Sequence, residues 1–361
     1  MTDTGRRVVV DAYGETPLEA IANHLRVVEQ VRPDPADLAP DDVVIRVRSC
    51  AVGWVDLLMT SGQYQHMPKP PYTPGLEYAG DVEWVGPAVE HVSVGDRVLA
   101  DGFETGPRSG GSHERWGGFA TWSVAPARGV KKLSDKLTYD QGTNLLGNYE
   151  TAYHCLIACG DLQAGETVLI HGASGNTGLA AVHLARLLGA TVIATGRNPA
   201  KLEIVRQQGA HHTIVSTDGF KDRVKELTGG RGVDVVYDGV GGPISVESLR
   251  CVKFGARFLI VGWAATPFVA RGKGKRGAPN ANVLPTNLIM MKGLKVMGCP
   301  TVISTQKDPS IRIERSRRID AWVESGDVKP YVGPIYALTD VVDAMKAKWT
   351  SQFVGGCVLH P

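Results

Sequence analysis

The sequence predicts an α/β protein with two domains, of which the first is rich in β-strands and the second contains a doubly wound parallel sheet. The chain has 361 residues, which is long for one ordinary domain and sufficient for two hydrophobic cores. Short apolar runs separated by Gly and Pro turns fill residues 1–145, whereas strand and helix patterns alternate from about residue 146 onward. This change places the domain boundary near residue 145.

The strands of the first domain are predicted from short runs that alternate apolar and polar residues or are apolar throughout. They cover residues 43–47, 79–85, 97–100 and 118–124. The second domain is predicted to contain strands at 167–171, 191–195, 212–215, 233–237 and 256–261, with helical segments between them. Such alternation gives a parallel sheet whose ligand crevice lies at the carboxyl ends of its strands.

One stretch of the second domain, residues 168–196, carries three glycines between an apolar run and a helical pattern. Val168–Ile170 is fit for a buried strand, and a helix is expected from about Asn176 to Leu188, closed by Gly189. Gly172 permits a sharp turn, Gly175 lets a pyrophosphate approach the backbone, and Gly178 lets the helix pack close to the strand. A flexible loop is the alternative for the glycines alone, but the surrounding β-α-β pattern favours a dinucleotide site.

This stretch and the later strand ends supply most of the candidate cofactor residues. The helix N-terminus directs N–H groups at the glycine turn, which makes it an anion site. The motif Asp238–Gly242 and Gly262 follow two later strands, although turn glycines also have purely structural reasons. The candidates are Gly172, Ser174, Gly175, Asn176, Thr177, Gly178, Gly239, Val240 and Gly262.

The cofactor is predicted to be NADPH rather than NADH. An NAD site usually places Asp or Glu after the second strand, where this chain has Gly196, Arg197 and then Lys201. Gly196 leaves room for a 2′-phosphate and Arg197 offers it a planar fork. The competing interpretation is that Arg197 and Lys201 are only the solvated start of a helix.

Composition excludes several other classes of function. The net charge of +2 implies no general attraction to nucleic acid or to membranes, and no run approaches the 18 apolar residues of a membrane span. The start, MTDTGRRVVVDAYGE, gives no signal-peptide pattern. The 6 cysteines are scattered, as in a reduced cytoplasmic protein, and Cys155 and Cys159 are interpreted as small hydrophobic residues rather than metal ligands.

The tail is predicted to form a helix at 311–325, a strand at 331–337, a helix at 339–348 and a last strand at 356–359. Its packing does not follow from the pattern alone. Several stretches, however, resemble one family in the right order. These are AVGWVDLLMTSGQY, PYTPGLEYAGDVEWVG, VGDRVLA, GGFATW, NYETAYHCL, HGASGNTG, GGRGVDVVYDGVGG, LPTNLIMMKGLKVMG and GDVKPYVGPIYALTDVVDAM.

The family that these stretches resemble is the medium-chain dehydrogenase/reductase superfamily, in its zinc-free quinone oxidoreductase and enoyl reductase branch. The resemblance implies a GroES-like catalytic domain, residues 1–145 completed by 301–361, and a Rossmann domain, residues 146–300. It also implies a homodimer. Two positions depart from the family, because Ser216 and Gly356 replace a tyrosine and a lysine that often lie near the cofactor.

The resemblance also locates the positions at which zinc-dependent members bind their metal. Here they are Gly53, Leu76 and Gly147, none of which has a Cys, His or carboxylate ligand. The four-cysteine lobe of a structural zinc site is missing too. No metal is therefore expected, and Glu77 is expected to be a structural partner.

Catalytic candidates come from the same resemblance. Tyr64 matches a tyrosine beside the nicotinamide that is proposed as a hydrogen-bond or proton donor, the alternative being an aromatic that covers the cofactor. Asn148 and Thr151 are expected to contact nicotinamide or ribose, the alternative being a helix cap. Gly53 replaces an asparagine of many members, and Trp54 follows it.

Two loops depart from the family's usual length. Residues 103–117 hold Arg108, His113, Arg115 and Trp116, and His113 is interpreted as a possible proton relay or simply a solvated side chain. Residues 268–280 carry a basic cluster that could attract phosphates of a coenzyme A thioester or of the cofactor, or could be only a solvated insertion.

The sequence thus predicts an NADPH-dependent, zinc-independent reductase that transfers hydride to an activated C=C bond, in an enone or enoyl thioester, or to a quinone. The cofactor carries this chemistry, which suits a chain with few catalytic groups. The substrate is expected to be a small molecule. A non-catalytic relative that binds NADPH in a structural or trafficking role is the alternative, and its RNA-binding version is disfavoured by the near-neutral charge.

Overall fold

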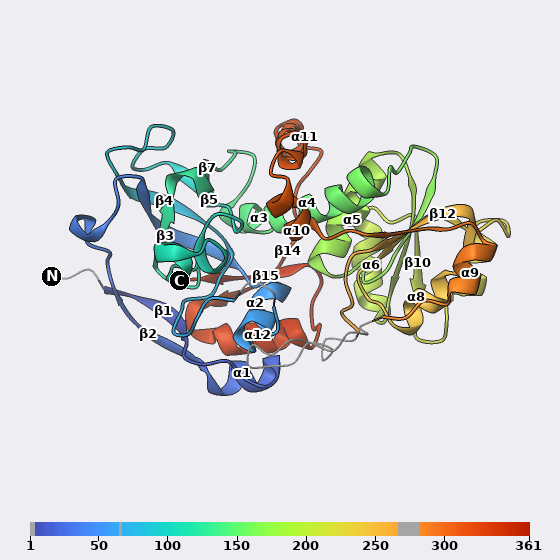
Figure 1. Ribbon diagram of the computed structural model, residues 1–361, viewed down its shortest axis with the longest axis horizontal. Coiled ribbons are helices and arrows are strands. Elements are labelled where there is room, and N and C mark those ends of the chain that lie inside the picture. The colour runs from blue at the N-terminus through green and yellow to red at the C-terminus, as the bar shows by residue number, and fades with distance from the viewer. Residues whose placement is uncertain (1–3, 65–66, 266–281) are drawn as a thin grey trace. The chain divides into compact units, whose positions relative to one another are not determined.

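The computed structural model describes residues 4–64, 67–265 and 282–361. They form two compact units (Figure 1). Among the described residues, unit 1 comprises 4–147 and 329–361, and unit 2 comprises 148–265 and 282–328. The basic cluster in residues 268–280, interpreted above either as a phosphate-attracting loop or as a solvated insertion, lies outside the described residues.

The tail is divided differently from the expectation. The helices α10 (Thr301–Lys307) and α11 (Ile311–Ser325) cluster with unit 2, and only the chain from Lys329 onward clusters with unit 1. Buried ion pairs explain the position of α11, because Arg312 Nη2 lies 2.6 Å from Glu150 Oε1 and Arg315 Nη2 lies 2.7 Å from Glu150 Oε2. Glu150 belongs to α4 (Leu146–Tyr153), and its side chain is almost fully buried.

Unit 2 contains the predicted doubly wound parallel sheet. Its strands are β8 (Thr167–Ile170), β9 (Thr191–Gly196), β10 (His212–Val215), β11 (Val233–Asp238), β12 (Val252–Ile260) and β13 (Lys295–Gly298). They pair in the order β10-β9-β8-β11-β12-β13, all parallel. The chain reverses its direction across the sheet between β8 and β11, and ligands of such sheets bind at this switch point.

The helices of unit 2 connect these strands. Besides α10 and α11 they are η5, a π-helical turn (His154–Cys159), α5 (Asn176–Leu187), α6 (Pro199–Gln207), α7 (Lys221–Leu227), α8 (Pro243–Ser248) and α9 (Thr286–Met291). The apolar strand residues Val168, Leu169 and Ile170 are fully buried, as the sequence predicts for a central strand.

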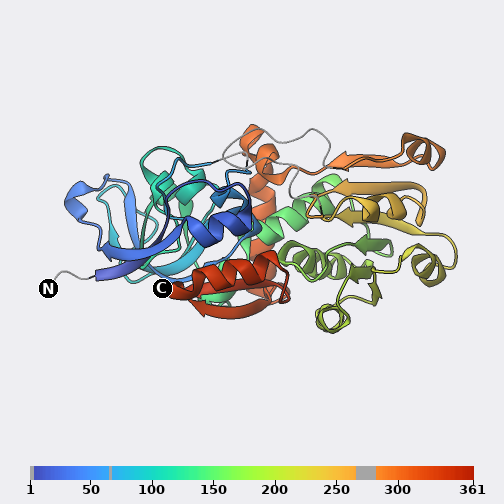
Figure 2. The same cartoon turned by 90° about the horizontal axis from the view of Figure 1, so that it is seen from below.

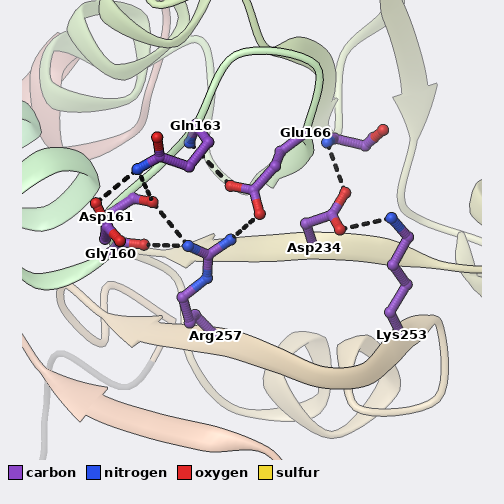
Figure 3. Close-up of polar contacts among 8 residues, drawn as sticks. Gly160, Asp161, Gln163, Glu166, Asp234, Lys253 and Arg257 are labelled. Atoms are coloured by element: carbon purple, nitrogen blue, oxygen red, sulfur yellow. Dashed lines mark hydrogen bonds and ion pairs between the residues drawn. The ribbon is translucent and has the colours of Figure 1, made fainter.

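The amino ends of the unit 2 strands are joined by a charged network (Figure 3). Arg257 Nη1 donates to the carbonyl oxygens of Gly160 and Asp161, both at 2.8 Å, and its Nη2 pairs with Glu166. Lys253 Nζ lies 2.5 Å from Asp234. A cavity of about 330 Å³ opens here, at the end of the strands opposite the switch point.

Unit 1 is built on a seven-stranded, mostly antiparallel sheet with the order β14-β15-β3-β4-β5-β7, in which β6 pairs with β3. Its strands are β3 (Asp42–Ala51), β4 (Glu77–Val85), β5 (Arg97–Ala100), β6 (Trp122–Pro126), β7 (Val130–Lys132), β14 (Val332–Ala337) and β15 (Gly356–His360). The strands β1 (Thr4–Val10) and β2 (Leu25–Val31), which the sequence did not indicate, form a separate antiparallel ribbon.

Two helices of unit 1, α3 (Tyr139–Thr143) and α12 (Val341–Trp349), pack on this sheet, and two more, α1 (Pro17–Asn23) and α2 (Trp54–Thr60), pack against α12. Figure 1 shows α12 next to α1 and α2, and Figure 2 shows it beside β14 and β15. Its buried residues Val341, Ala344 and Met345 join the main core of the unit.

None of the described helices is both long enough and apolar enough to cross a bilayer.

Candidate functional site

The glycine turn after β8 has the geometry that the sequence predicts. Gly172 adopts φ +63°, a left-handed conformation that favours glycine. A Cβ atom on Gly178 would lie 2.4 Å from the carbonyl oxygen of Gly172, so only glycine lets α5 start this close to the turn. The expected roles of these two glycines in the fold are therefore confirmed.

Gly175 is exposed, and a Cβ there would meet nothing closer than the Gly172 oxygen at 3.4 Å. The surrounding chain thus does not require glycine at this position. Gly175 is also the N-cap of α5 and supplies no side-chain acceptor. The first N–H groups of this 12-residue helix are therefore not covered by a side chain of Gly175. Such a helix start suits the pyrophosphate of a dinucleotide.

A second loop, after β11, is held by the buried carboxylate of Asp238. Its Oδ1 accepts from the N–H groups of Val240, at 2.8 Å, and Gly241, at 2.9 Å. Its Oδ2 accepts from the hydroxyl of Ser245. Asn282 extends the set, because its Oδ1 accepts from Gly242 N at 3.1 Å and its Nδ2 donates to Ser245 Oγ at 2.8 Å. The glycine-rich backbone is thus fixed without filling the space in front of it.

The loops after β8, β11 and β12 meet at the switch point. A Cβ on Gly172 would lie 3.2 Å from Val240 Cγ2, and one on Gly262 would lie 3.4 Å from the oxygen of Gly239. No described atom lies within 4 Å of the position of a Cβ on Gly239. The structure therefore brings together the predicted residues Gly172, Gly239, Val240 and Gly262.

His171 follows β8 directly, just before the glycine turn, and was not among the predicted site residues. Its Nδ1 and Nε2 lie 2.7 Å from Thr195 Oγ1 and Ser248 Oγ, respectively. Ser248 Oγ donates its proton to the carbonyl of Ile244, so His171 donates through Nε2–H and accepts at Nδ1. Burial lowers the pKa of His171 to about 4, against the opposing charges of Asp238 and Glu247. A neutral imidazole therefore links the ends of β8 and β9 to α8.

The predicted 2′-phosphate residues lie at the end of β9 and the start of α6. Arg197 is exposed, and no described carboxylate forms an ion pair with it. Lys201 is partly buried; burial, and next the charge of Arg197, lower the pKa of its ammonium group. Ser216 Oγ donates to the carbonyl of Gly196 at 3.2 Å. Two cations thus lie close together beside a strand end that carries no acid.

Asn148 and Thr177, predicted from different motifs, are neighbours in unit 2. Thr177 Oγ1 lies 3.4 Å from Asn148 Oδ1, and Asn148 is 9% exposed. This contact joins α4 to the first turn of α5. Thr151 is half-buried one turn further along α4. Ser174 and Asn176 lie in and just after the turn and are also half-buried.

In unit 1, the first position that binds zinc in metal-dependent relatives is the N-cap of α2. Gly53 N donates to Asp56 Oδ2 at 2.9 Å, and Gly75 N donates to Asp56 Oδ1 at 3.1 Å. Burial raises the pKa of Asp56 to about 6, although these backbone donors and the charge of Arg108 lower it. A Cβ on Gly53 would lie 2.9 Å from Asp56 Oδ2, so the carboxylate already fills the place of a larger side chain.

The zinc position at Gly147 is closed in the same way. Glu77 Oε1 accepts from Gly147 N at 2.6 Å, and a Cβ on Gly147 would lie 2.1 Å from that oxygen. Gly53, Leu76 and Gly147 offer no ligand atoms, and the described residues contain no group of three or more His, Cys, Asp or Glu arranged for a metal. This donor set does not fit zinc, and Glu77 is the structural partner that the sequence suggests.

Tyr64 follows α2 and is half-buried. The guanidinium carbon of Arg108 lies 5.6 Å from the centre of its ring. Trp54, at the start of α2, stacks on Trp349 of α12 with ring centres 4.9 Å apart and planes 6° apart. Its ring thus packs within unit 1.

His113, considered above as a proton relay or a solvated loop residue, is half-buried in a contact with the start of β3. Its Nε2 lies 2.6 Å from Oδ1 of the buried Asp42, and its side chain is 15% exposed. Asp42 begins β3, whereas Gly53 follows the other end of that strand. The contact therefore holds the loop 103–117 on the sheet.

Sequence reasoning missed His171, Ser245, Ser248 and Asn282 as supports of the loops, and Asp56 as the residue that holds Gly53. One signal was available for two of them. Ser245 and Ser248 are three apart in a short helix directly after the glycine loop, so they share a helix face. The partners of His171 and Asn282 are distant in sequence, and no local pattern indicates them.

Comparisons with known proteins agree with this geometry. The family model described as alcohol dehydrogenase GroES-like domain matches residues 39–135, and the one described as zinc-binding dehydrogenase matches residues 177–308. Quinone oxidoreductase of Homo sapiens is 32% identical over 320 residues, which cover 88% of each chain.

Two solved structures share the fold over nearly the whole chain. Quinone oxidoreductase of Pseudomonas syringae pv. Tomato DC3000 has a TM-score of 0.77 and 26% identity, covering 99% of this chain and 100% of its own. A mycobacterial protein solved in complex with NADPH has a TM-score of 0.78 and 26% identity over the same shares. The chain therefore belongs to the medium-chain dehydrogenase/reductase superfamily of oxidoreductases, in its quinone oxidoreductase branch, and combines a GroES-like unit with a Rossmann unit.

Proposed function

We propose that this protein is an NADPH-dependent reductase that transfers hydride, without zinc, to a quinone or to the activated C=C bond of an enone or enoyl thioester. One observation carries the proposal. The chain combines the glycine turn after β8, which suits a dinucleotide, with a Glu77 carboxylate that fills the space where a zinc ligand at position 147 would lie. The chain therefore keeps a turn suited to a hydride-carrying cofactor but lacks the ligands of the zinc that assists alcohol oxidation in related enzymes.

Different residues of unit 2 bind different parts of the cofactor, which supplies the hydride when bound. Gly175 and the start of α5 receive the pyrophosphate, and the loop fixed by Asp238 gives close backbone approach at Gly239 and Val240. Arg197 and Lys201 bind the 2′-phosphate. Asn148 and Thr151 contact the nicotinamide or ribose from α4. The mycobacterial neighbour described with NADPH supports this choice of cofactor.

The residue proposed to act on the substrate is Tyr64. Hydride addition to a conjugated carbonyl or a quinone leaves negative charge on oxygen, which needs a hydrogen-bond donor or a proton. The phenol of Tyr64 provides such a donor. The human relative named quinone oxidoreductase supports a quinone as acceptor, while enones and enoyl thioesters demand the same geometry of hydride transfer.

We also propose that the protein acts in the cytoplasm as a homodimer. All six cysteines are free thiols and five of them are buried, which suits a reducing compartment. The alternative function remains a non-catalytic NADPH-binding protein with a structural or trafficking role.

A panel of acceptors separates these functions. The purified chain is mixed with NADPH and, in turn, quinones, enones and enoyl-CoA thioesters, and the loss of absorbance at 340 nm is followed. We expect turnover with at least one class. NADPH binding without turnover of any acceptor would favour the non-catalytic alternative.

Replacing Arg197 tests the choice between the two nicotinamide cofactors. Arg197→Ala should weaken NADPH binding about tenfold to a hundredfold and leave NADH binding nearly unchanged, because only NADPH carries the 2′-phosphate. Dissociation constants from fluorescence titration measure this, and the exposed Arg250→Ala is the matched control. Equal losses for both cofactors would remove the assignment.

Replacing Tyr64 tests the proposed donor. Tyr64→Phe should lower kcat about tenfold to a hundredfold while NADPH affinity stays the same, because only the hydroxyl is lost. Tyr336→Phe, elsewhere in unit 1, serves as the control. A kcat equal to wild type would mean that water or another group supplies the proton.

A further inference from the structure

Arg108 lies next to two aromatic rings, those of Tyr64 and Phe103, in a loop that departs from the family's usual length. It ends the short helical turn η2 (Gly106–Arg108). Its guanidinium carbon lies 5.6 Å from the ring centre of Tyr64 and also 5.6 Å from that of Phe103. The two aromatic faces therefore hold the cation next to Tyr64 by cation–π attraction.

The guanidinium has no polar partner among the residues that the structure describes. Its Nε is buried without a hydrogen bond, and no ion pair or hydrogen bond of its terminal nitrogens occurs within that part of the chain. Arg257 and Arg312, also in protected positions, are both paired with carboxylates. A half-buried arginine that forms no hydrogen bond with a carboxylate is unusual, because removing its charge from water is costly.

The nearby carboxylate of Asp56 forms no hydrogen bond with Arg108 within the described part of the chain. Asp56 is close enough for the charge of Arg108 to lower its pKa. Its two oxygens, however, accept from the backbone N–H groups of Gly53 and Gly75. Arg108 thus has an anionic neighbour that balances part of its charge, while its planar fork stays available for another oxygen.

We propose that Arg108 binds the substrate oxygen on which negative charge develops and so determines which acceptors are reduced. The inference rests on the proposed function, in which Tyr64 acts on that oxygen. In an enone or enoyl thioester, the β carbon gains a hydride, the C=C pair becomes a double bond between the α carbon and the carbonyl carbon, and the C=O π pair moves to the oxygen. A proton from Tyr64 or from water then adds to the α carbon, and the C=O bond forms again. The substrate gains two electrons, which NADPH would supply with the hydride when bound. Arg108 donates to the oxyanion formed in between.

The kinetic test compares Arg108→Gln and Arg108→Lys with a matched control. Arg108→Gln should lower kcat about a hundredfold, the size of an oxyanion donor's effect, with NADPH affinity unchanged. Arg108→Lys should recover part of this loss, because it keeps the charge but not the fork. Arg115→Gln is the control: Arg115 is exposed, belongs to the same loop and lies 5.5 Å from the ring centre of Trp116. Its kcat should equal that of wild type.

A binding test gives an answer that does not require turnover. Wild type should bind 4-nitrophenolate, a planar oxyanion, at least tenfold more tightly than Arg108→Gln does, and both should bind neutral nitrobenzene equally. If wild type shows this preference but reduces no acceptor, the result would support the anion site while removing the proposed function. Equal phenolate affinity in the two proteins, or equal kcat for Arg108→Gln and Arg115→Gln, would overturn the inference.

Discussion

Asp56 and Asp238 have the same role in different units, since each is a buried carboxylate that accepts hydrogen bonds from the backbone of glycine-containing turns. Asp56 holds Gly53 and Gly75, and Asp238 holds Val240 and Gly241. A charged acceptor makes stronger bonds to N–H groups than a neutral one does. Single side chains thus fix backbone at both groups of candidate residues. The space beside Gly239 stays open, whereas the Asp56 carboxylate fills the space beside Gly53.

His171 leads to a prediction about stability and pH. Its pKa is about 4 in the folded chain, below the value of about 6.5 in an unfolded chain. Between these values the unfolded state binds more protons, so stability is lost as pH falls from about 6.5 to about 4. The loss amounts to roughly 3 kcal/mol. His171→Gln should lack this part of the pH dependence, as measured by urea unfolding between pH 4.5 and 7.5.

Asp56 titrates in an overlapping range with the opposite sign. Its folded pKa, about 6, is above its ordinary value of 3.8, so its contribution to stability falls as pH rises through this range. The comparison must therefore be made between variants rather than from one curve. His212→Gln, at an exposed position, is the control and should keep the wild-type dependence. An unchanged dependence in His171→Gln would contradict the assignment.

The sequence predicts residues whose role depends on their own backbone and misses those whose role depends on a distant partner. Gly172 and Gly178 are predictable because a turn and a close helix require glycine locally. Glu77 contacts Gly147 across 70 positions of sequence, and only the family resemblance suggested a structural role for it. Nothing local indicates that Arg108 would reach Tyr64, because that contact depends on how a loop folds.

At the scale of elements, the short helix α8 supports three loops at the carboxyl ends of the sheet. Ser245 donates to Asp238 after β11, and Ser248 contacts His171 after β8. Glu247 Oε1 accepts from Phe220 N, at 2.6 Å, and Lys221 N, at 2.8 Å, where α7 begins. The polar residues of one helix therefore fix the positions of the backbone segments proposed to bind the cofactor.

Replacing Ser245 tests this support. Ser245→Ala removes a donor to the buried Asp238 and the acceptor of Asn282 Nδ2. Leaving such groups unsatisfied costs about 1–3 kcal/mol. We expect the free energy of unfolding to fall by about this amount and NADPH affinity to drop severalfold, since Val240 and Gly241 lose a fixed anchor. Urea unfolding and fluorescence titration measure the two effects.

Ser325→Ala provides the comparison for this prediction, because Ser325 ends α11 in the same unit and is exposed. It should change neither quantity. A stable Ser245→Ala protein with wild-type affinity would show that the loop keeps its shape without α8.

Predicting elements succeeded where burial dictates the pattern. The central strands β8, β9 and β11 lie close to their expected ranges, because a strand covered on both faces is mainly apolar. The edge strand β10 also matches its expected range, although His212 and Val215 are exposed. The ribbon β1–β2 was missed, since the exposed and buried residues of its strands do not alternate regularly. The helix α11 was predicted, but its attachment to unit 2 was not. That attachment depends on Arg312 and Arg315 meeting Glu150, a long-range pairing of charges that a helical pattern does not show.

At the scale of the whole molecule, the outer edge of β13 is the feature that bears on assembly. β13 ends the six-stranded sheet, and its outer side pairs with none of the described strands. Exposed apolar side chains lie on the adjoining segments: Phe254 is 84% exposed, Met290 is 74% exposed and Met291 is 68% exposed. An open strand edge beside apolar surface favours pairing with another chain.

The occupant proposed for this edge is a second copy of the chain, paired antiparallel about a twofold axis, because such a closed contact uses the edge once on each copy. Wild type should therefore sediment as a dimer at micromolar concentration. The double variant Met290→Lys with Met291→Lys should sediment as a folded monomer. The new positive charges on α9 of the two copies would repel each other, and the apolar contact of the methionines would be lost. Val94→Lys changes an exposed residue of unit 1 that is 63% accessible and should stay dimeric. If wild type is a monomer, the proposed homodimer is excluded. If both variants remain dimers, this edge is excluded as the interface.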